Sequence, residues 1–153
     1  MIVVNSKDEL KKIINQRIEQ HSPKCDLNDI DVSRVTDMSD LFFSSKFNGD
    51  ISQWNVSSVR NMNGMFYNSQ FNGDISKWDV HNVESMFNMF NESRFNGDIS
   101  KWDVSSVETM SGMFANSEFN GDISKWNVRR VKDMSMMFDK SPLEGKEPSW
   151  YKK

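Results

Sequence analysis

The chain has 153 residues, of which 27% are charged and 37% hydrophobic, a balance typical of one soluble globular domain. Its net charge of −3 excludes the strongly basic surface typical of nucleic-acid binding, so we expect no nucleic-acid partner. No stretch approaches the ~18 consecutive apolar residues of a membrane span, the start lacks a basic segment before an apolar core, and Cys25 is the only cysteine. We therefore expect a cytoplasmic protein without disulfides.

Residues 1–24 lie outside the repeated pattern that fills the rest of the chain. Ile2 to Val4 favour a short strand, and Ser6 to Glu9 (SKDE) form a capping box, in which the Ser and Glu side chains bond backbone N–H groups at the start of a helix. The apolar face of this helix is Leu10, Ile13, Ile14 and Ile18. The helix should end before Pro23. We predict a strand-plus-helix cap; a mobile partner-binding arm is the alternative.

A ten-residue phrase then occurs four times at a spacing of 24 residues. It reads FNGDISKWDV at 71–80 and 95–104, and differs by one or two residues at 47–56 and 119–128. Valine, methionine and Met-Phe positions continue the register, which gives the unit FNGDISxW[ND]VxxVxxMxxMFxxSx. A self-similar period of 20–50 residues indicates that each unit buries its apolar face only against its neighbours.

The unit sets the expected boundaries within a repeat region, 25–150. The four full coils are 47–70, 71–94, 95–118 and 119–142. A degenerate first coil is expected at 25–46 and a truncated last coil at 143–150, before a short tail at 151–153. Terminal units with a degenerate sequence are typical of repeat arrays, because the end units contact water instead of a neighbouring unit.

Two spacings predict the conformation of each unit. In 51–56 the pattern IxxWxV ends in the alternation typical of a short strand. In 59–66 the pattern VxxMxxMF places apolar residues at i, i+3, i+6 and i+7, one stripe of a helix about two turns long. Asn48-Gly49 supplies a turn, since both residues tolerate positive φ. We therefore predict an α/β solenoid of 24-residue coils, with short parallel strands on one face and short helical segments on the other.

The pattern IxxWxV resembles the LxxLxL of leucine-rich repeats, and the whole unit resembles the repeat of BspA-like bacterial surface proteins and lipoproteins. The resemblance covers about residues 25–150. It implies a leucine-rich-repeat-like solenoid that binds other macromolecules and is not an enzyme. The chain lacks the secretion signal of the surface-exposed members, which counts against an adhesin role.

No residue pattern points to catalysis, a metal or a cofactor. The only histidines, His21 and His81, have neither the spacing of metal ligands nor that of a catalytic triad. Cys25 is expected to be a small buried hydrophobe. The repeated aspartates are expected to serve turns, because one carboxylate per 24 residues is too sparse for repeat-type calcium binding: they are Asp50, Asp74, Asp98 and Asp122. The repeated tryptophans are expected to be buried: they are Trp54, Trp78, Trp102 and Trp126.

The candidate partner-binding residues form two groups. The first group contains the polar residues that the predicted strands would turn to solvent: Gln53, Asn55, Lys77, Asp79, His81, Lys101, Asp103, Lys125, Asn127, Arg129 and Arg130. Within it, Arg129 and Arg130 suit a carboxylate or phosphate. The second group is Phe87 and Met136, apolar residues at positions that are polar or glycine in other units, which favours a contact patch on the predicted helical face. A merely solvated face, or two isolated exposed residues, is the alternative.

Together these features predict a non-enzymatic scaffold, without catalytic or metal-binding residues, that binds a protein partner of unknown identity. An immunity or inhibitor-type protein that covers a toxin would suit a small cytoplasmic repeat protein. The alternative is an adhesin-like structural module on the cell surface. We expect a monomer.

Overall fold

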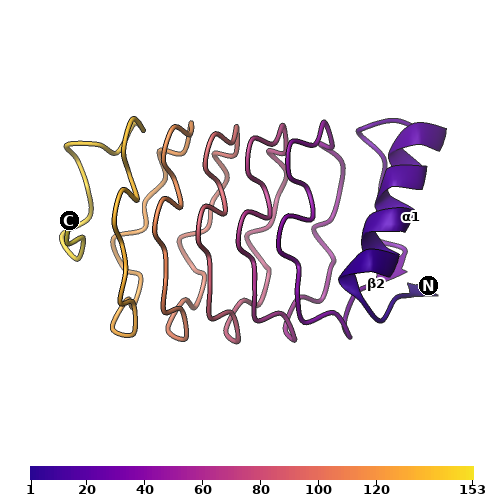
Figure 1. The fold of residues 1–153 in the computed structure, drawn as a ribbon, viewed down its shortest axis with the longest axis horizontal. Coiled ribbons are helices and arrows are strands. Elements are labelled where there is room, and N and C mark those ends of the chain that lie inside the picture. Colours follow the sequence, from indigo (N-terminus) through magenta and orange to yellow (C-terminus); the bar gives the residue numbers. More distant parts are fainter.

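The computed structural model describes all 153 residues, and regular secondary structure is confined to the first 31. Strand β1 is Ile2–Val3, helix α1 is Lys7–Gln20 and strand β2 is Ile30–Asp31. β1 and β2 pair in parallel, with Ile2 opposite Ile30 and Val3 opposite Asp31. The rest of the chain consists of turns and irregular backbone, laid in loops side by side between the two termini at opposite ends of the long axis (Figure 1).

The predicted α/β solenoid of the leucine-rich-repeat type is wrong. No helix lies outside α1, and no strand occurs in any of the IxxWxV segments. Instead, Trp54 N–H donates to Ile51 O at 3.2 Å, and Val59 N–H donates to Val56 O at 2.9 Å. Each of these bonds closes a β-turn. The i, i+3 spacing of apolar residues therefore reflects consecutive turns, whose ends point inward and whose two central residues point outward, and not a helical stripe.

Left-handed backbone at two positions of each unit excludes the predicted helical segments, because an α-helix needs φ near −63° at every residue. These positions have φ between 52° and 64°. The first position is Asp40, Gly64, Asn88, Gly112 and Met136, and the second is Ser44, Asn68, Glu92, Asn116 and Lys140. Glycine and asparagine adopt this conformation most readily, and the single-sequence pattern of apolar residues carries no sign of it.

Backbone hydrogen bonds join each unit to the next. Gly64 N–H donates to Phe87 O at 2.8 Å and Phe66 N–H donates to Met89 O at 2.9 Å. Isolated parallel bridges join equivalent residues of neighbouring units, for example Asn61 with Ser85. Neighbouring 24-residue units are thus paired, although the paired backbone is made of turns.

One apolar cluster of 39 buried residues runs through the molecule. Its centre is a row of phenylalanines whose neighbouring rings lie 5.4–5.9 Å apart: Phe42, Phe66, Phe90, Phe114 and Phe138. The four repeated tryptophans are only 3–5% exposed, which confirms their predicted burial. Each indole is also anchored by a hydrogen bond, as when Trp78 Nε1 donates to Ile51 O at 3.1 Å.

Helix α1 covers the N-terminal end of this core. The predicted capping residues are confirmed, since Ser6 Oγ accepts Glu9 N–H at 3.2 Å and Glu9 Oε2 accepts Asn5 N–H at 2.6 Å. On the inner face Leu10 and Ile14 are buried. Near the other end of α1, the Arg17 guanidinium donates to both carboxylate oxygens of Asp29, at 3.0 and 2.6 Å, and so ties the helix to the first unit.

Candidate functional site

All eleven side chains of the first candidate group are exposed, but no strand carries them. The prediction that strands form this face is therefore wrong. Lys77 and Lys101, for example, occupy central positions of β-turns, where side chains point to solvent. The structure spreads the group along a series of turns and brings together Asp79 with His81 and Arg129 with Arg130.

The carboxylate and amide members of the first group stabilise their own turns. Asp103 Oδ1 accepts both Ser105 N–H at 3.0 Å and Ser105 Oγ–H at 2.6 Å, and these bonds lower the pKa of Asp103. Asn55 accepts from Ser57 in the same way, and Asn127 accepts Arg129 N–H. Asp79 Oδ1 lies 2.6 Å from His81 Nδ1, and this hydrogen bond lowers the pKa of Asp79.

The lysines and arginines of the first group have no acidic partner, whereas His81 lies beside Asp79. Lys77, Lys101 and Lys125, for example, form no ion pair. Arg129 and Arg130 lie beside Ser105 and Ser106 around an open hollow of about 410 Å³ without hydrophobic lining. This corner can attract an anionic group, but no buried polar side chain shapes it for a particular one.

Phe87 and Met136 line one hollow of about 350 Å³, which we call the Phe87–Met136 hollow. They come from the units on either side of 95–118, and they are 44% and 64% exposed. Between them lies the apolar Ala115. The other lining residues are polar or glycine: Asn88, Asn91, Ser111, Gly112, Asn116, Asp139 and Lys140. The two residues of the second candidate group, 49 positions apart, thus belong to one surface site.

Gly112 keeps this hollow open. Its φ is 64°, and a Cβ atom there would lie 2.2 Å from Asn88 Oδ1, so a side chain cannot be added without displacing Asn88. Met136 occupies the equivalent position of the next unit, also with positive φ, at 58°. A methionine in left-handed backbone is strained relative to glycine or asparagine. The fold therefore does not require methionine at position 136, and packing of the fold does not account for its side chain.

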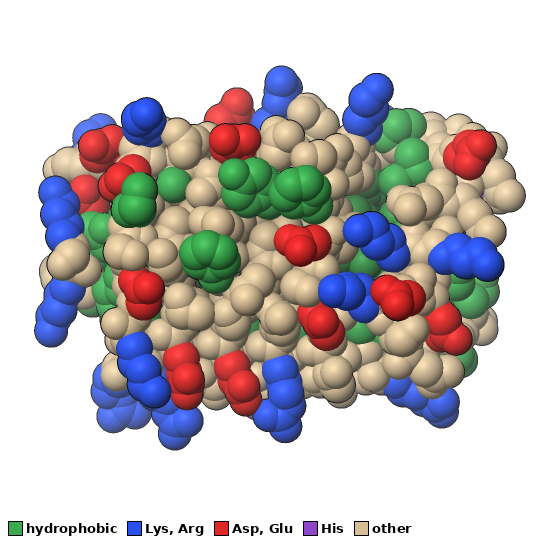
Figure 2. Space-filling view, in the orientation of Figure 1, with side chains coloured by type: hydrophobic (Ala, Val, Ile, Leu, Met, Phe, Trp, Pro, Cys, Tyr) green, Lys and Arg blue, Asp and Glu red, His purple; other side chains and the backbone are tan.

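The exposed Phe43 and the half-buried Tyr67 are aromatic residues that the sequence analysis missed. Their rings lie 5.3 Å apart and are stacked, and Phe43 is 52% exposed. Their equivalents in later units are Asn91, Ala115 and Asp139, all of which line the hollow. Comparison of this column across the units would have revealed them. Hydrophobic side chains gather among polar ones on the face drawn in Figure 2.

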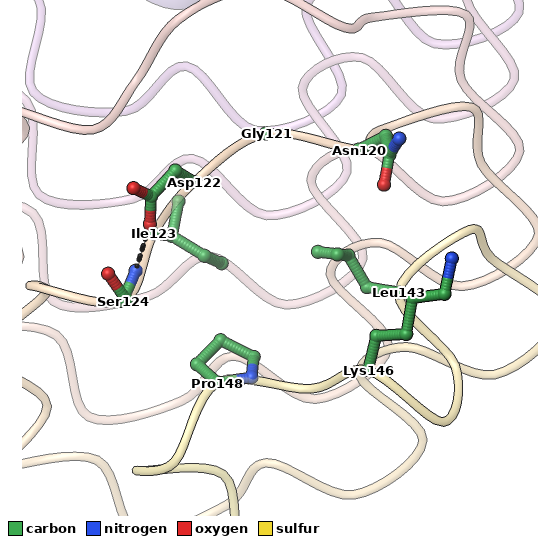
Figure 3. A pocket seen from close by; sticks show the side chains of 8 residues that line it. All are labelled: Asn120, Gly121, Asp122, Ile123, Ser124, Leu143, Lys146 and Pro148. Atoms are coloured by element: carbon green, nitrogen blue, oxygen red, sulfur yellow. Dashed lines mark hydrogen bonds between the residues drawn. The ribbon is translucent and has the colours of Figure 1, made fainter.

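The repeated aspartates serve turns, as predicted. Asp74 Oδ1 accepts Ser76 N–H at 2.9 Å and Ser76 Oγ–H at 2.7 Å, and these bonds lower the pKa of Asp74. Asp122 accepts Ser124 N–H in the same way, beside a hollow of about 270 Å³ where Leu143 and Pro148 meet the last full unit (Figure 3). A carboxylate next to a serine is therefore a turn element here and not part of a catalytic pair.

Cys25 does not have the environment of a reactive thiol. It is half-buried against the core, and burial raises the pKa of its thiol, whereas a nucleophilic cysteine needs a lowered pKa. Histidine, cysteine, aspartate and glutamate side chains form no cluster of three or more that could hold a metal ion. Among the hollows described, the Phe87–Met136 hollow combines exposed aromatic and thioether groups with a fixed backbone frame.

Comparisons with known proteins identify a family. None of the helices is long and apolar enough to span a membrane. Searches of curated proteins and of solved structures give no significant match. The family model described as "Mycoplasma protein of unknown function, DUF285" matches residues 9–116 and, a second time, 91–150, which together cover most of the chain. The chain therefore belongs to the DUF285 family.

Proposed function

We propose that the protein is a non-enzymatic scaffold that binds another protein through the Phe87–Met136 hollow. The observation that carries this proposal is the convergence of Phe87, Ala115 and Met136, from three different units, on one hollow. Aromatic residues and methionine are enriched at protein interfaces, where their burial supplies most of the favourable energy. Methionine also adapts its shape to a partner surface.

The surroundings of the hollow favour a protein partner over a nucleic acid or a small metabolite. The lining holds one acidic and one basic residue, Asp139 and Lys140, so it has no excess charge for phosphates. Further along the column that contains Ala115, beyond Asn91, the stacked rings of Phe43 and Tyr67 add a second apolar group. A contact patch of scattered apolar groups with a polar rim is typical of protein recognition.

Within this function we propose a cytoplasmic immunity or inhibitor-type role, in which the rigid row of units covers a functional surface of its partner. A chain with one cysteine, Cys25, needs no oxidising compartment. The resemblance of the repeat to BspA-like surface proteins supports the alternative, a surface module. Protease treatment of intact cells distinguishes the two, because a cytoplasmic protein stays intact and a surface module is degraded.

The test is a capture experiment with matched variants of the tagged full chain. The double variant Phe87→Ser with Met136→Gly introduces residues found at these positions in other units, and so should leave the fold intact. We expect the unmodified chain to retain one stoichiometric partner and the double variant to lose it. A control variant, Lys77→Glu with Lys101→Glu, changes the first candidate group and should retain the partner.

Two outcomes would contradict the proposal as stated. Loss of the partner in the Lys77→Glu and Lys101→Glu control alone would move the binding site to the exposed turns. Equal capture by all three chains would remove both candidate groups from the interface.

A further inference from the structure

The turn-rich segment of each unit has two chemically different edges. In 110–114, alternate N–H groups point to the next unit: Met110, Gly112 and Phe114 donate to Asp133 O, Ser135 O and Met137 O, each at 2.9 Å. Along this segment carbonyl oxygens point to the preceding unit. Left-handed residues recur in this segment, at Gly112 and Asn116, and the separation of its edges differs from a β-strand, which directs donors and acceptors to both sides.

The last full unit ends in an edge of unused donors. The N–H groups of Met134, Met136 and Phe138 have no acceptor in the chain. The next donor of the series, Lys140 N–H, is taken by the Glu144 carboxylate at 2.7 Å. Backbone N–H groups without an acceptor cost free energy when they are removed from water, so they are usually paired.

The apolar core is also partly open beside these donors. Val128, Val131 and Met134 are partly exposed, although their equivalents one unit earlier are at most 1% exposed. Trp126 and Trp150 complete the apolar lining of a hollow of about 400 Å³. Its remaining lining residues are Asn127, Arg129 and Lys152, two of them basic and none acidic. The segment that carries Trp150 thus covers one half of the last unit and leaves the other half open.

We propose that this open edge, residues 128–138, binds an extended segment of a partner protein as an added unit. The segment would supply alternate carbonyl oxygens to Met134, Met136 and Phe138 N–H, and apolar side chains at every third position to Val131 and Met134. An acidic side chain would lie near Arg129 and Lys152. Binding of a backbone segment to unpaired edge groups is an established mode of peptide recognition. A second copy of this chain is a poorer occupant, since α1 covers its complementary N-terminal end, where Met38 and Leu41 are at most 3% exposed.

The probe is a synthetic peptide of residues 104–116, VSSVETMSGMFAN, with a fluorescent label at its N-terminus. Within the chain, the carbonyls of Thr109, Ser111 and Met113 already accept N–H groups of the preceding unit in this pattern. Its Glu108 would also meet Lys132, its ion-pair partner within the chain. Fluorescence anisotropy against the full chain should show saturable binding of one peptide per chain.

Three changes decide whether this edge is the site. Replacing Gly112 of the peptide by glycolic acid weakens the Ser111 carbonyl as an acceptor, and should weaken binding about three- to ten-fold. In the protein, Val131→Asp should weaken it at least about ten-fold, and Lys132→Glu serves the same purpose should Val131→Asp not fold. Phe87→Ser lies outside this edge and should leave peptide binding unchanged, which separates this site from the Phe87–Met136 hollow.

The inference rests on backbone N–H groups and on a second hollow, and Met136 is the one residue that it shares with the Phe87–Met136 hollow, so either proposal can fail alone. Absence of binding at millimolar peptide would overturn it. So would equal affinity for the amide and ester peptides, or insensitivity to both protein variants. A rise in molecular mass with concentration in the absence of peptide would instead assign the edge to self-association.

Discussion

The two ends of the molecule cover the apolar core to different extents. At the N-terminal end, α1 covers the first unit, and Val32, Val35 and Met38 are at most 1% exposed. At the C-terminal end the equivalent residues, Val128, Val131 and Met134, are partly exposed. Because these residues hold the same positions in the unit, their different burial comes from what covers them. A repeated unit therefore cannot bury its own core residues, and each end needs a separate covering segment.

The largest expected effect comes from an interior tryptophan. Trp78→Ala should lower the free energy of unfolding by about 3–5 kcal/mol, since it removes a buried ring and leaves a cavity. Trp150→Ala removes an equivalent ring with the same kind of Nε1–H bond, at 2.9 Å, from the partly open end, and should cost less than about 2 kcal/mol. Urea unfolding followed by tryptophan fluorescence measures both. Lys77 is the exposed neighbour of Trp78, so Lys77→Ala should change the free energy of unfolding by no more than about 0.5 kcal/mol. Equal costs for the two tryptophan variants would mean that the C-terminal end is no more open than the middle.

Truncation of a buried side chain in α1, which covers the N-terminal end, should lower the free energy of unfolding somewhat less. Leu10→Ala in α1 should destabilise the protein by about 3 kcal/mol, because Leu10 is fully buried against the first unit. Lys11→Ala, one position along on the exposed face of α1, is the matched control and should be near neutral. Chemical denaturation of both variants provides the measurement. A cost below about 1 kcal/mol for Leu10→Ala would indicate that α1 is a loosely attached arm.

At the other end, Met136→Gly should stabilise the protein by about 1 kcal/mol. It relieves a left-handed methionine whose side chain is 64% exposed and therefore contributes little burial. Asn88→Gly, at the equivalent interior position, is the control and should gain less, because asparagine tolerates this backbone and Asn88 Oδ1 accepts a hydrogen bond from Asn91. Thermal unfolding of the two variants measures the difference. Destabilisation by Met136→Gly would show that the methionine side chain supports the fold after all.

The repeat period, the buried tryptophans and the start of α1 were predictable from the sequence because each depends on which residues recur or on a local cap. Trp78 recurs in step with Trp54 and Trp102, and Ser6 precedes Glu9 at the spacing of a capping box. The backbone of the units was not predictable in this way. Apolar residues at i and i+3 fit a helix and a series of β-turns equally well, and left-handed φ at residues such as Glu92 leaves no signal in apolar spacing.

The candidate surface was predictable only in part, for a related reason. Phe87 and Met136 stood out because they break columns of polar residues or glycine, but their meeting at one hollow depends on Gly112 in the unit between them. The unused N–H groups at Met134 and Phe138 follow from the orientation of the peptide planes, which no residue type specifies. Features carried by the backbone therefore required the structure, whereas features carried by side-chain type did not.

The smallest expected effect is an acid sensitivity confined to the N-terminal end. The hydrogen bonds from Arg17 lower the pKa of Asp29 below its ordinary value, so the stability that this pair adds is fully present above the pKa of the unfolded chain, near 4. It is lost as the pH falls through the lower folded pKa. Partial burial raises the pKa of Asp37, but hydrogen bonds from Ser39 and the Lys7 ammonium, with Nζ 3.5 Å from Asp37 Oδ2, together lower it. The stability that Asp37 adds is therefore also lost as the pH falls.

Hydrogen exchange measured at pH 5 and pH 2.5, corrected for intrinsic rates, should therefore show larger loss of protection in α1 than at Phe90 or Phe114 in the interior. Asp29→Asn, which cannot ionise, should lose part of the α1 protection already at pH 5 and change less on acidification. Similar loss of protection along the whole chain would instead point to the turn aspartates, such as Asp74 and Asp98, whose pKa values are lowered by the serine two residues on. In that case acid would destabilise every unit equally, and the covered and open ends would not differ in their response to pH.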